Sequence, residues 1–250
     1  MIEINLLHLP GIYNGADRLE VRTMQRSLPM SEGDKALLRE VPFISLLTVE
    51  VRQKMLDMAT SIHYEPRDII FREREPSDFF FCVLNGYVRL YRLAKDGKEA
   101  DIRLCGPGET FAACFLYAEG GYRYNAEATA TTVVVRFETS KVRALAERYS
   151  EIDKALVGLI AAQLLDSIDC LANDRLRTAP QRVANYLLGA CAGDGQAASI
   201  RLPFSKSLLA GKLGLAPEAL SRAFSTLRGS GVTVHGRLIE IEDPEALRSL

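Results

Sequence analysis

A row of polar side chains recurs along one predicted helix near the end of the chain. Glu218, Ser221, Arg222 and Ser225 are spaced so that they share one helical face. A carboxylate, a small hydroxyl and a forked guanidinium are groups that hydrogen-bond to base edges in the DNA major groove. We therefore predict that Glu218, Ser221 and Arg222 read DNA bases. The alternative is that the row is an ordinary solvated face of a small helical pair.

The opposite face of the same segment is apolar. Leu220, Phe224 and Leu227 recur at i, i+4 and i+7, which is the spacing of one buried helical face. A shorter apolar helix precedes it. Gly214 suits a helix end with left-handed backbone, and Pro217 suits the first position of the next helix. Two short helices joined by such a turn predict a helix-turn-helix.

Two short apolar runs, 230–234 and 237–241, follow this pair and read as strands. His235-Gly236 between them fits a tight turn, because Gly can take positive φ. A hairpin directly behind a helix-turn-helix predicts a winged module.

Positive charge is concentrated on this module. Between Arg201 and Ile239 there are six Lys or Arg and one acid, net +5, although the whole chain has a net charge of −1. Such a balance suits contacts to phosphates, although a solvated basic face is the alternative. The predicted phosphate contacts are Ser205, Lys206, Lys212, Ser225 and Arg228.

The middle of the chain, from Ile62 to Phe137, has a residue pattern typical of β structure. Short runs rich in branched and aromatic residues alternate with turn residues, which predicts an antiparallel sandwich or barrel. The expected strands cover 69–71, 79–84, 87–91 and 133–137. Asn85-Gly86 and Asp96-Gly97 are typical of hairpin turns.

Helices are expected on both sides of this β region. Two short ones fall in 31–58. A longer one begins near Ser140, breaks around Tyr149-Ser150 and runs to about Asn173, and another covers 177–192. The second part of the long helix has two apolar stripes. One suits packing on the β domain and the other suits a dimer, unless both are buried within one subunit. The proposed dimer stripe is Val157, Ile160, Leu164, Ile168 and Leu171.

The whole chain therefore reads as an α+β protein. The expected divisions are an extension of unknown role (1–30), a β-roll sensor domain (31–148), a dimerisation helix (149–174) and a winged helix-turn-helix domain (175–250). With 48% hydrophobic and 25% charged residues, the composition is that of a soluble protein. Five cysteines without CxxC spacing suggest reduced cytoplasmic thiols. We expect no signal peptide and no membrane span.

The phrases FFFCVLNGYVRLYRLAKDGKEADIRLCGPGETFA and LAPEALSRAFSTLRGSGVTVHGRLIEI, with the order of the parts, resemble the CRP/FNR family of bacterial transcription regulators over roughly 43–250. The likeness is strongest to FNR-like nitrogen-oxide and low-oxygen regulators, including the dissimilatory nitrate respiration regulator. The resemblance implies a homodimer that binds double-stranded DNA and works with RNA polymerase. The pattern Glu-x-x-Ser-Arg, met by Glu218, Ser221 and Arg222, implies a TTGAT-type half-site in an inverted repeat.

The resemblance also defines an effector pocket, which is degenerate here. Cyclic-nucleotide binding in the family needs a Gly-Glu pair, present as Gly108-Glu109, and an Arg for the phosphate, where this chain has Tyr124. Arg123 is one place away, and a one-residue slip along a strand reverses the face. We therefore expect no binding of cAMP.

Other effectors stay open. An FNR-type iron–sulfur cluster is not expected, because no cysteine precedes Cys82. Haem is possible, although His8, His63, His235 and Cys114 offer no clear ligand. The sensor could respond to nitric oxide, oxygen or redox state, or to no ligand at all. A rival function is a cyclic-nucleotide module that regulates a partner protein. An enzyme is not expected, since we find no nucleophile elbow, P-loop or metal cluster.

Overall fold

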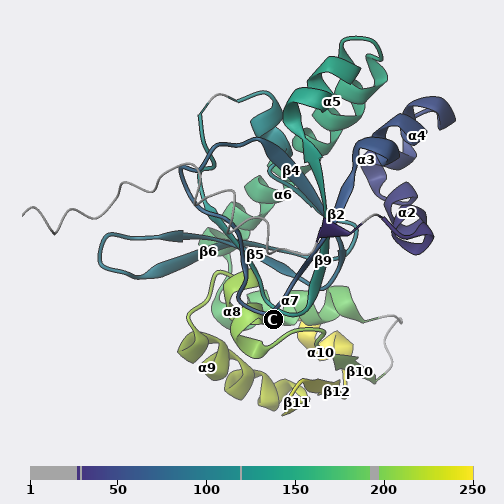
Figure 1. Ribbon diagram of the computed structural model, residues 1–250. Coiled ribbons are helices and arrows are strands. Elements are labelled where there is room, and N and C mark those ends of the chain that lie inside the picture. Colours follow the sequence, from purple (N-terminus) through teal and green to yellow (C-terminus); the bar gives the residue numbers. More distant parts are fainter. Residues whose placement is uncertain (1–26, 29, 119, 192–196, 250) are drawn as a thin grey trace, which may run out of the picture.

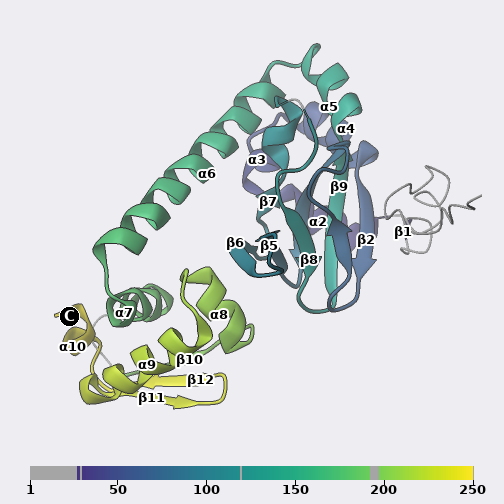
Figure 2. The same cartoon turned by 90° about the vertical axis from the view of Figure 1, so that its left-hand side faces the viewer.

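The structure is a computed structural model that describes residues 27–28, 30–118, 120–191 and 197–249. Most of the predicted extension 1–30, His8 and the stretch 192–196 therefore lie outside the described residues. An upper lobe holds the β strands of the sensor, a lower lobe holds the winged module, and one long helix joins the two (Figures 1 and 2).

Short helices precede the β-roll. They are α2 (Glu32–Arg39), α3 (Pro42–Ser45) and α4 (Val49–Met58). A capping box starts α2: the Ser31 hydroxyl accepts from the Asp34 N–H at 3.0 Å, and the Asp34 carboxylate accepts from the Ser31 N–H at 3.2 Å. Leu38, Phe43 and Met55 are fully buried and fix these helices on the β-roll core.

The sensor strands form two antiparallel sheets, which confirms the predicted antiparallel sandwich or barrel. One sheet has the order β1-β2-β9-β4-β7 and the other β3-β8-β5-β6. Their strands are β1 (Ser27–Leu28), β2 (Thr60–Tyr64), β3 (Ile69–Phe71), β4 (Phe79–Asn85), β5 (Val88–Leu93), β6 (Glu99–Cys105), β7 (Thr110–Phe111), β8 (Asn125–Ala128) and β9 (Thr132–Glu138). Aromatic side chains fill the space between the sheets. The stacked rings of Phe71 and Tyr122 have centroids 3.7 Å apart, and those of Phe81 and Phe111 have centroids 5.1 Å apart.

The two predicted hairpin turns have different outcomes. Asp96-Gly97 joins β5 to β6, which pair with each other, so that prediction is confirmed. Asn85-Gly86 joins β4 to β5, which lie in different sheets, so the hairpin predicted there is wrong. The turn conformation itself is present, with Gly86 at φ +81°. The chain changes sheets here because β4 pairs with β9 and β5 pairs with β8.

A 3₁₀ turn (Ala113–Leu116) lies between β7 and β8, and two helices, α5 (Thr139–Ala146) and α6 (Glu151–Leu176), follow β9. The predicted break near Tyr149-Ser150 separates α5 from α6. Leu156 is fully buried against the sensor, whereas Leu164 is 60% exposed and Leu165 is 63% exposed. Figure 2 shows α6 as a long diagonal rod with one side free.

The same helix bears on the expected absence of a membrane span. It has 26 residues, and an 18-residue window of it has a mean hydropathy of 1.7, so by length and composition alone it could cross a membrane. Only 11% of this window is buried within the chain.

The C-terminal domain confirms the winged helix-turn-helix. Its elements are α7 (Ala179–Ala190), β10 (Ala198–Arg201), α8 (Lys206–Lys212), α9 (Pro217–Leu227), a 3₁₀ turn (Arg228–Ser230), β11 (Val232–His235), β12 (Leu238–Ile241) and α10 (Pro244–Arg248). The sheet order is β10-β12-β11, so a strand that the sequence analysis did not predict, β10, completes the wing. Gly214 has φ +61° as expected for the turn, and Gly236 has φ +61° in the hairpin.

The two domains contact each other directly as well as through α6. Leu104 of β6 is 6% exposed and belongs to the hydrophobic cluster of the C-terminal domain. Tyr87 and Phe204 meet edge to face with ring centroids 5.2 Å apart. Sensor and winged module therefore form a continuous packed body.

The turn glycines offer a test of the β-roll. Gly86 and Gly97 both have positive φ, but an added Cβ at Gly86 would lie 2.5 Å from Thr132 Oγ1 and 2.7 Å from Thr131 O, while at Gly97 nothing lies within 4 Å. Gly97→Ala should lower the free energy of unfolding by about 1 kcal/mol, the cost of left-handed backbone. Gly86→Ala should lower it by about 3 kcal/mol, because overpacking adds to that cost. Urea unfolding monitored on the sensor checks this, and equal losses would contradict it.

Candidate nucleic-acid interface

The helix α9 has one buried row and one exposed row. Leu220, Phe224 and Leu227 are 3%, 7% and 0% exposed and pack in the C-terminal core. Glu218 and Arg222 are exposed on the other side, and so are the neighbouring hydroxyls of Ser221 and Ser225. The predicted base-reading row therefore faces outward.

Four of the predicted contact residues meet in one groove. Lys206 from α8, Ser221 and Ser225 from α9, and Arg228 after α9 line a groove of about 210 Å³. Ser207 also lines it, although the sequence analysis did not select this residue; its place next to Lys206 was the available signal. Two cationic groups and three hydroxyls around one small groove suit a DNA phosphate.

Ser205 and Lys212, two other predicted phosphate contacts, lie differently. Ser205 is the N-cap of α8, where its hydroxyl accepts from the Leu208 N–H at 3.3 Å. Lys212 stands at the other end of α8, beside Arg103 and Leu104 of the sensor. It also borders a hollow between α6 and α7. Lys212 is therefore not brought together with Lys206 and Arg228.

The turn between α8 and α9 is held from outside the helix pair. Arg182 of α7 donates through Nη1 to the backbone oxygen of Leu213 at 2.9 Å. The same nitrogen donates to Asp174 Oδ1 near the end of α6 at 2.6 Å. The Arg182 side chain is only 16% exposed. One guanidinium thus links the long helix, α7 and the turn that orients α9.

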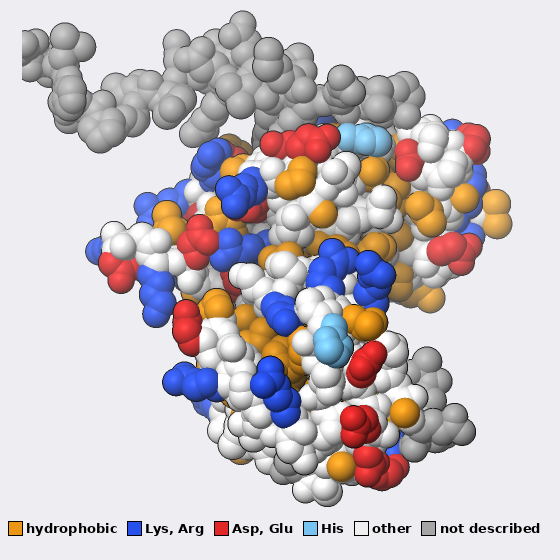
Figure 3. All heavy atoms as spheres, turned by 90° about the horizontal axis from the view of Figure 1, so that it is seen from below, with side chains coloured by type: hydrophobic (Ala, Val, Ile, Leu, Met, Phe, Trp, Pro, Cys, Tyr) orange, Lys and Arg blue, Asp and Glu red, His pale blue; other side chains and the backbone are white. Residues whose placement is uncertain are grey.

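The underside of the molecule shows how the charges gather. Seen from below, Lys and Arg side chains lie across the middle and the left of the face with acidic side chains among them, and the lower right carries mainly acidic ones (Figure 3). The segment from Arg201 to Ile239 has a local net charge of +5. A surface of this sign attracts the DNA backbone.

The sensor pocket does not suit a cyclic nucleotide. Gly108 has φ +81° and forms the expected turn. The Glu109 carboxylate, however, accepts from Arg103 Nη2 at 2.6 Å and from the Gly106 N–H at 2.6 Å. Both of its oxygens are therefore bonded within the chain, and a ribose hydroxyl would have to displace them. The Arg103–Glu109 pair was not foreseen, because it depends on how β6 folds over the turn.

Tyr124, which the sequence analysis placed where the family has its phosphate-binding Arg, lies in an aromatic cluster. Its ring lies 5.7 Å from Phe71 and 5.9 Å from Phe115, and burial raises the pKa of its hydroxyl well above the usual range. Arg123 is exposed and lines a surface hollow together with Arg74 and Arg92. The residues present do not fit a bound cyclic phosphate.

The two described histidines lie on the surface of different domains. His63 on β2 and His235 on the wing are both exposed. Among the described residues, no group of three or more His, Cys, Asp or Glu could hold a metal ion.

The described cysteines are free thiols of two kinds. Cys82 and Cys105 are fully buried, and burial raises the pKa of both thiols to about 12. Cys114 is exposed and Cys191 is partly buried. Because the thiolate is the reactive form, Cys82 and Cys105 stay inert at neutral pH.

Alkylation tests this difference. Iodoacetamide on the native protein at about pH 8 should modify Cys114 and leave Cys82 and Cys105 intact, because Cys114 is exposed whereas the other two are buried and have a thiol pKa raised to about 12. Peptide mass spectrometry identifies the modified residues, and unfolded protein is the control in which all five react. Rapid native modification of Cys82 would contradict the buried position.

Both domains of the chain match families of known proteins. A family model for the cyclic nucleotide-binding domain matches residues 61–149, and one for the Crp-like helix-turn-helix domain matches residues 181–250. The chain is 32% identical over 193 residues to the nitrogen fixation regulation protein FixK of Rhizobium meliloti, covering 75% of this chain and 85% of that protein.

Solved structures agree with this. FixK2 from Bradyrhizobium japonicum has a TM-score of 0.66 and 29% identity, covering 77% of this chain and 96% of that one. A putative cyclic nucleotide binding protein from Ruegeria pomeroyi has a TM-score of 0.61 and 33% identity, covering 87% and 96%. The β-roll, the long helix and the winged module match in order as well as in fold, and the chain belongs to the CRP/FNR family of transcription regulators, with a DNA-binding helix-turn-helix.

Proposed function

We propose that this regulator is a cytoplasmic homodimer that reads a TTGAT-type inverted repeat with α9. The observation that carries the proposal is the outward row of α9, in which Glu218, Ser221 and Arg222 are exposed while Leu220 and Phe224 are buried. No other described element combines an exposed carboxylate, hydroxyl and guanidinium with a basic groove beside it.

The chemistry of this row suits the half-site. Arg222 can donate twice to a guanine, and Glu218 can accept from a cytosine amino group. Ser221 lies between them and is small enough to let the helix approach the bases. Lys206 and Arg228 would hold the phosphates that fix the register of α9 in the groove.

A second copy of the chain is the proposed partner of α6. Val157, Leu164, Ile168 and Leu171 are 55%, 60%, 52% and 53% exposed on one stripe, and Ile160 among them is partly exposed. Helices with such stripes pair along their length. A two-fold dimer presents two copies of α9, and the target is then a palindrome with half-sites about one helical turn apart.

Membrane insertion is a weaker explanation for the apolar surface of α6. A hydrocarbon core is about 30 Å thick and would separate the elements at the two ends of a spanning helix. The domains at the ends of α6 touch directly, with Tyr87 against Phe204. Gln163, in the middle of α6, donates to Thr110 O of the sensor at 2.7 Å. We therefore propose that the chain works without a membrane.

The sensor is proposed to control DNA binding without a cyclic nucleotide. The internal bonds of Glu109 and the aromatic packing of Tyr124 support this and count against the rival module that binds cAMP for a partner protein. Nitric oxide, oxygen and redox state stay candidate signals. RNA polymerase is the proposed second partner, because a transcription regulator acts on its recruitment or progress.

Band shifts on a TTGAT/ATCAA inverted repeat test base reading. Arg222→Ala should weaken binding by at least about tenfold and relax preference at one base pair, because a bidentate contact contributes about 1–3 kcal/mol of discrimination.

Lys206→Ala should weaken binding to specific and scrambled DNA alike and reduce the salt dependence of the affinity, since it removes a phosphate contact. Wild-type binding to scrambled DNA as tight as to the repeat would reject the proposal.

Sedimentation of two variants tests the dimer. Leu164→Glu places a charge in the exposed stripe and should convert the dimer to a monomer at micromolar concentration, because an unpaired buried charge is costly. Leu176→Glu is the matched control: the same change on the same helix, at a residue that is 83% exposed and outside the stripe. A monomeric wild type, or dimers of both variants with equal stability, would contradict the assignment.

A further inference from the structure

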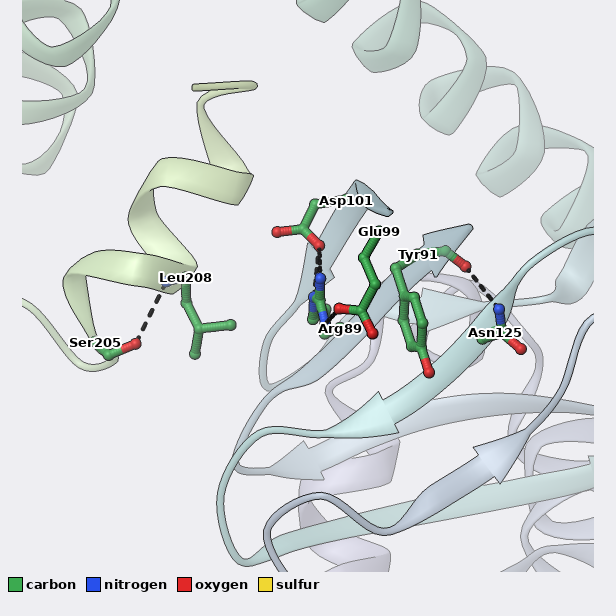
Figure 4. Close-up of polar contacts among 7 residues, drawn as sticks. All are labelled: Arg89, Tyr91, Glu99, Asp101, Asn125, Ser205 and Leu208. Carbon is green, nitrogen blue, oxygen red and sulfur yellow. Dashed lines mark hydrogen bonds and ion pairs between the residues drawn. The ribbon is translucent and has the colours of Figure 1, made fainter. Parts of the chain in front are cut away.

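The sensor touches the first helix of the helix-turn-helix along a narrow contact that we call the seam. Its sensor side consists of Tyr87, Asp101 and Leu104, and its C-terminal side of Phe204, Leu208 and Gly211. Figure 4 shows Asp101 and Arg89 on the sensor strands opposite Ser205 and Leu208 of α8. The seam is separate from α6, so it is a second connection between the domains.

Gly211 of α8 has no room for a side chain on the side that faces the sensor. A Cβ added there would overlap Asp101 Oδ2 and would lie 2.7 Å from its Cγ and 3.1 Å from its Cβ. Glycine inside a helix is unfavourable relative to Ala, and Gly211 has ordinary helical backbone without positive φ. The close approach of Asp101 explains why this helix tolerates a glycine.

The Asp101 side chain is not free to swing away. Its Oδ1 is ion-paired with Arg89, whose Nη1 also bonds Glu99 Oε2 at 2.7 Å. The side chains of Arg89 and Asp101 are 18% and 21% exposed. Moving the carboxylate to accommodate a larger residue at 211 would break this half-buried network.

Apolar contacts close the rest of the seam. Leu104 is 6% exposed and lies in the C-terminal core, although it comes from a sensor strand. The ring of Tyr87 meets Phe204, which immediately precedes the N-cap of α8. Between Asp101 and Leu104, the same strand carries Arg103, which bonds Glu109 in the sensor turn. The strand β6 thus touches both the sensor turn and α8.

The docked arrangement leaves the reading surface open. Glu218, Ser221 and Arg222 are exposed while the seam is closed. The seam therefore does not mask α9; it fixes the direction in which α9 points from the sensor.

We propose that the seam is a positioning joint: β6 holds α8 so that the two α9 helices of a dimer meet both half-sites at once. This rests on the proposed function, because it needs a dimer and a palindrome. Opening the seam lets each winged module turn on its own, and DNA binding must then remove that freedom. The affinity for DNA with two half-sites then falls, while the affinity for DNA with one half-site stays the same.

The test compares DNA with two half-sites and DNA with one half-site intact and the other scrambled. Full-length Gly211→Ala should bind the two-site duplex about tenfold more weakly than wild type, and the one-site duplex within about twofold of wild type. A tenfold change lies within the range of interaction free energies between contacting residues. Gly189→Ala is the matched control, since Gly189 is also helical, lies in the same domain and has nothing within 4 Å of an added Cβ. It should leave both affinities unchanged.

A second substitution keeps the test independent of folding. Asp101→Ala removes the carboxyl group and leaves only the 3.1 Å contact between the two Cβ atoms. Gly211→Ala with Asp101→Ala should therefore bind the two-site duplex almost as well as Asp101→Ala alone. Failure of this rescue, equal loss on both duplexes, or tighter two-site binding by Gly211→Ala would each overturn the joint. If wild type shows no preference for the repeat, the proposed function fails instead.

Discussion

The burial of one side of α9 is the constraint on which the interface depends. Leu220, Ala223, Phe224 and Leu227 lie against α7 and the wing, and each buried Leu or Phe contributes roughly 1.5–3 kcal/mol. Turning α9 by one residue would expose this row and bury Arg222 instead. The direction of Glu218 and Arg222 is therefore fixed by apolar packing behind them, and not by any contact of their own.

Features written in a few neighbouring residues were predictable. The apolar spacing of α9, the glycine at 214, the proline at 217 and the wing turn at Gly236 all follow local rules and are present as expected. Asn85-Gly86 follows the same kind of rule, yet there the prediction failed. A turn motif specifies the local bend, whereas the partner strands, β9 and β8, are decided about forty or more residues away.

The candidate site shows the same division. Spacing alone could select Glu218, Ser221 and Arg222, because one helix presents them. It could not place Lys212, whose surroundings come from β6 and α6, or reveal the bond between Arg103 and Glu109. The predicted effector pocket is informative for a related reason: the sequence could nominate Tyr124 for the position of the phosphate-binding Arg, but the aromatic packing around Tyr124 is visible only in the fold.

Arg182 connects the position of α6 to the position of the turn that precedes α9. Its planar guanidinium hydrogen-bonds both to Asp174 near the end of α6 and to the Leu213 carbonyl in the turn between α8 and α9. A shift of the far end of α6 would therefore displace Arg182, and with it the turn that precedes α9.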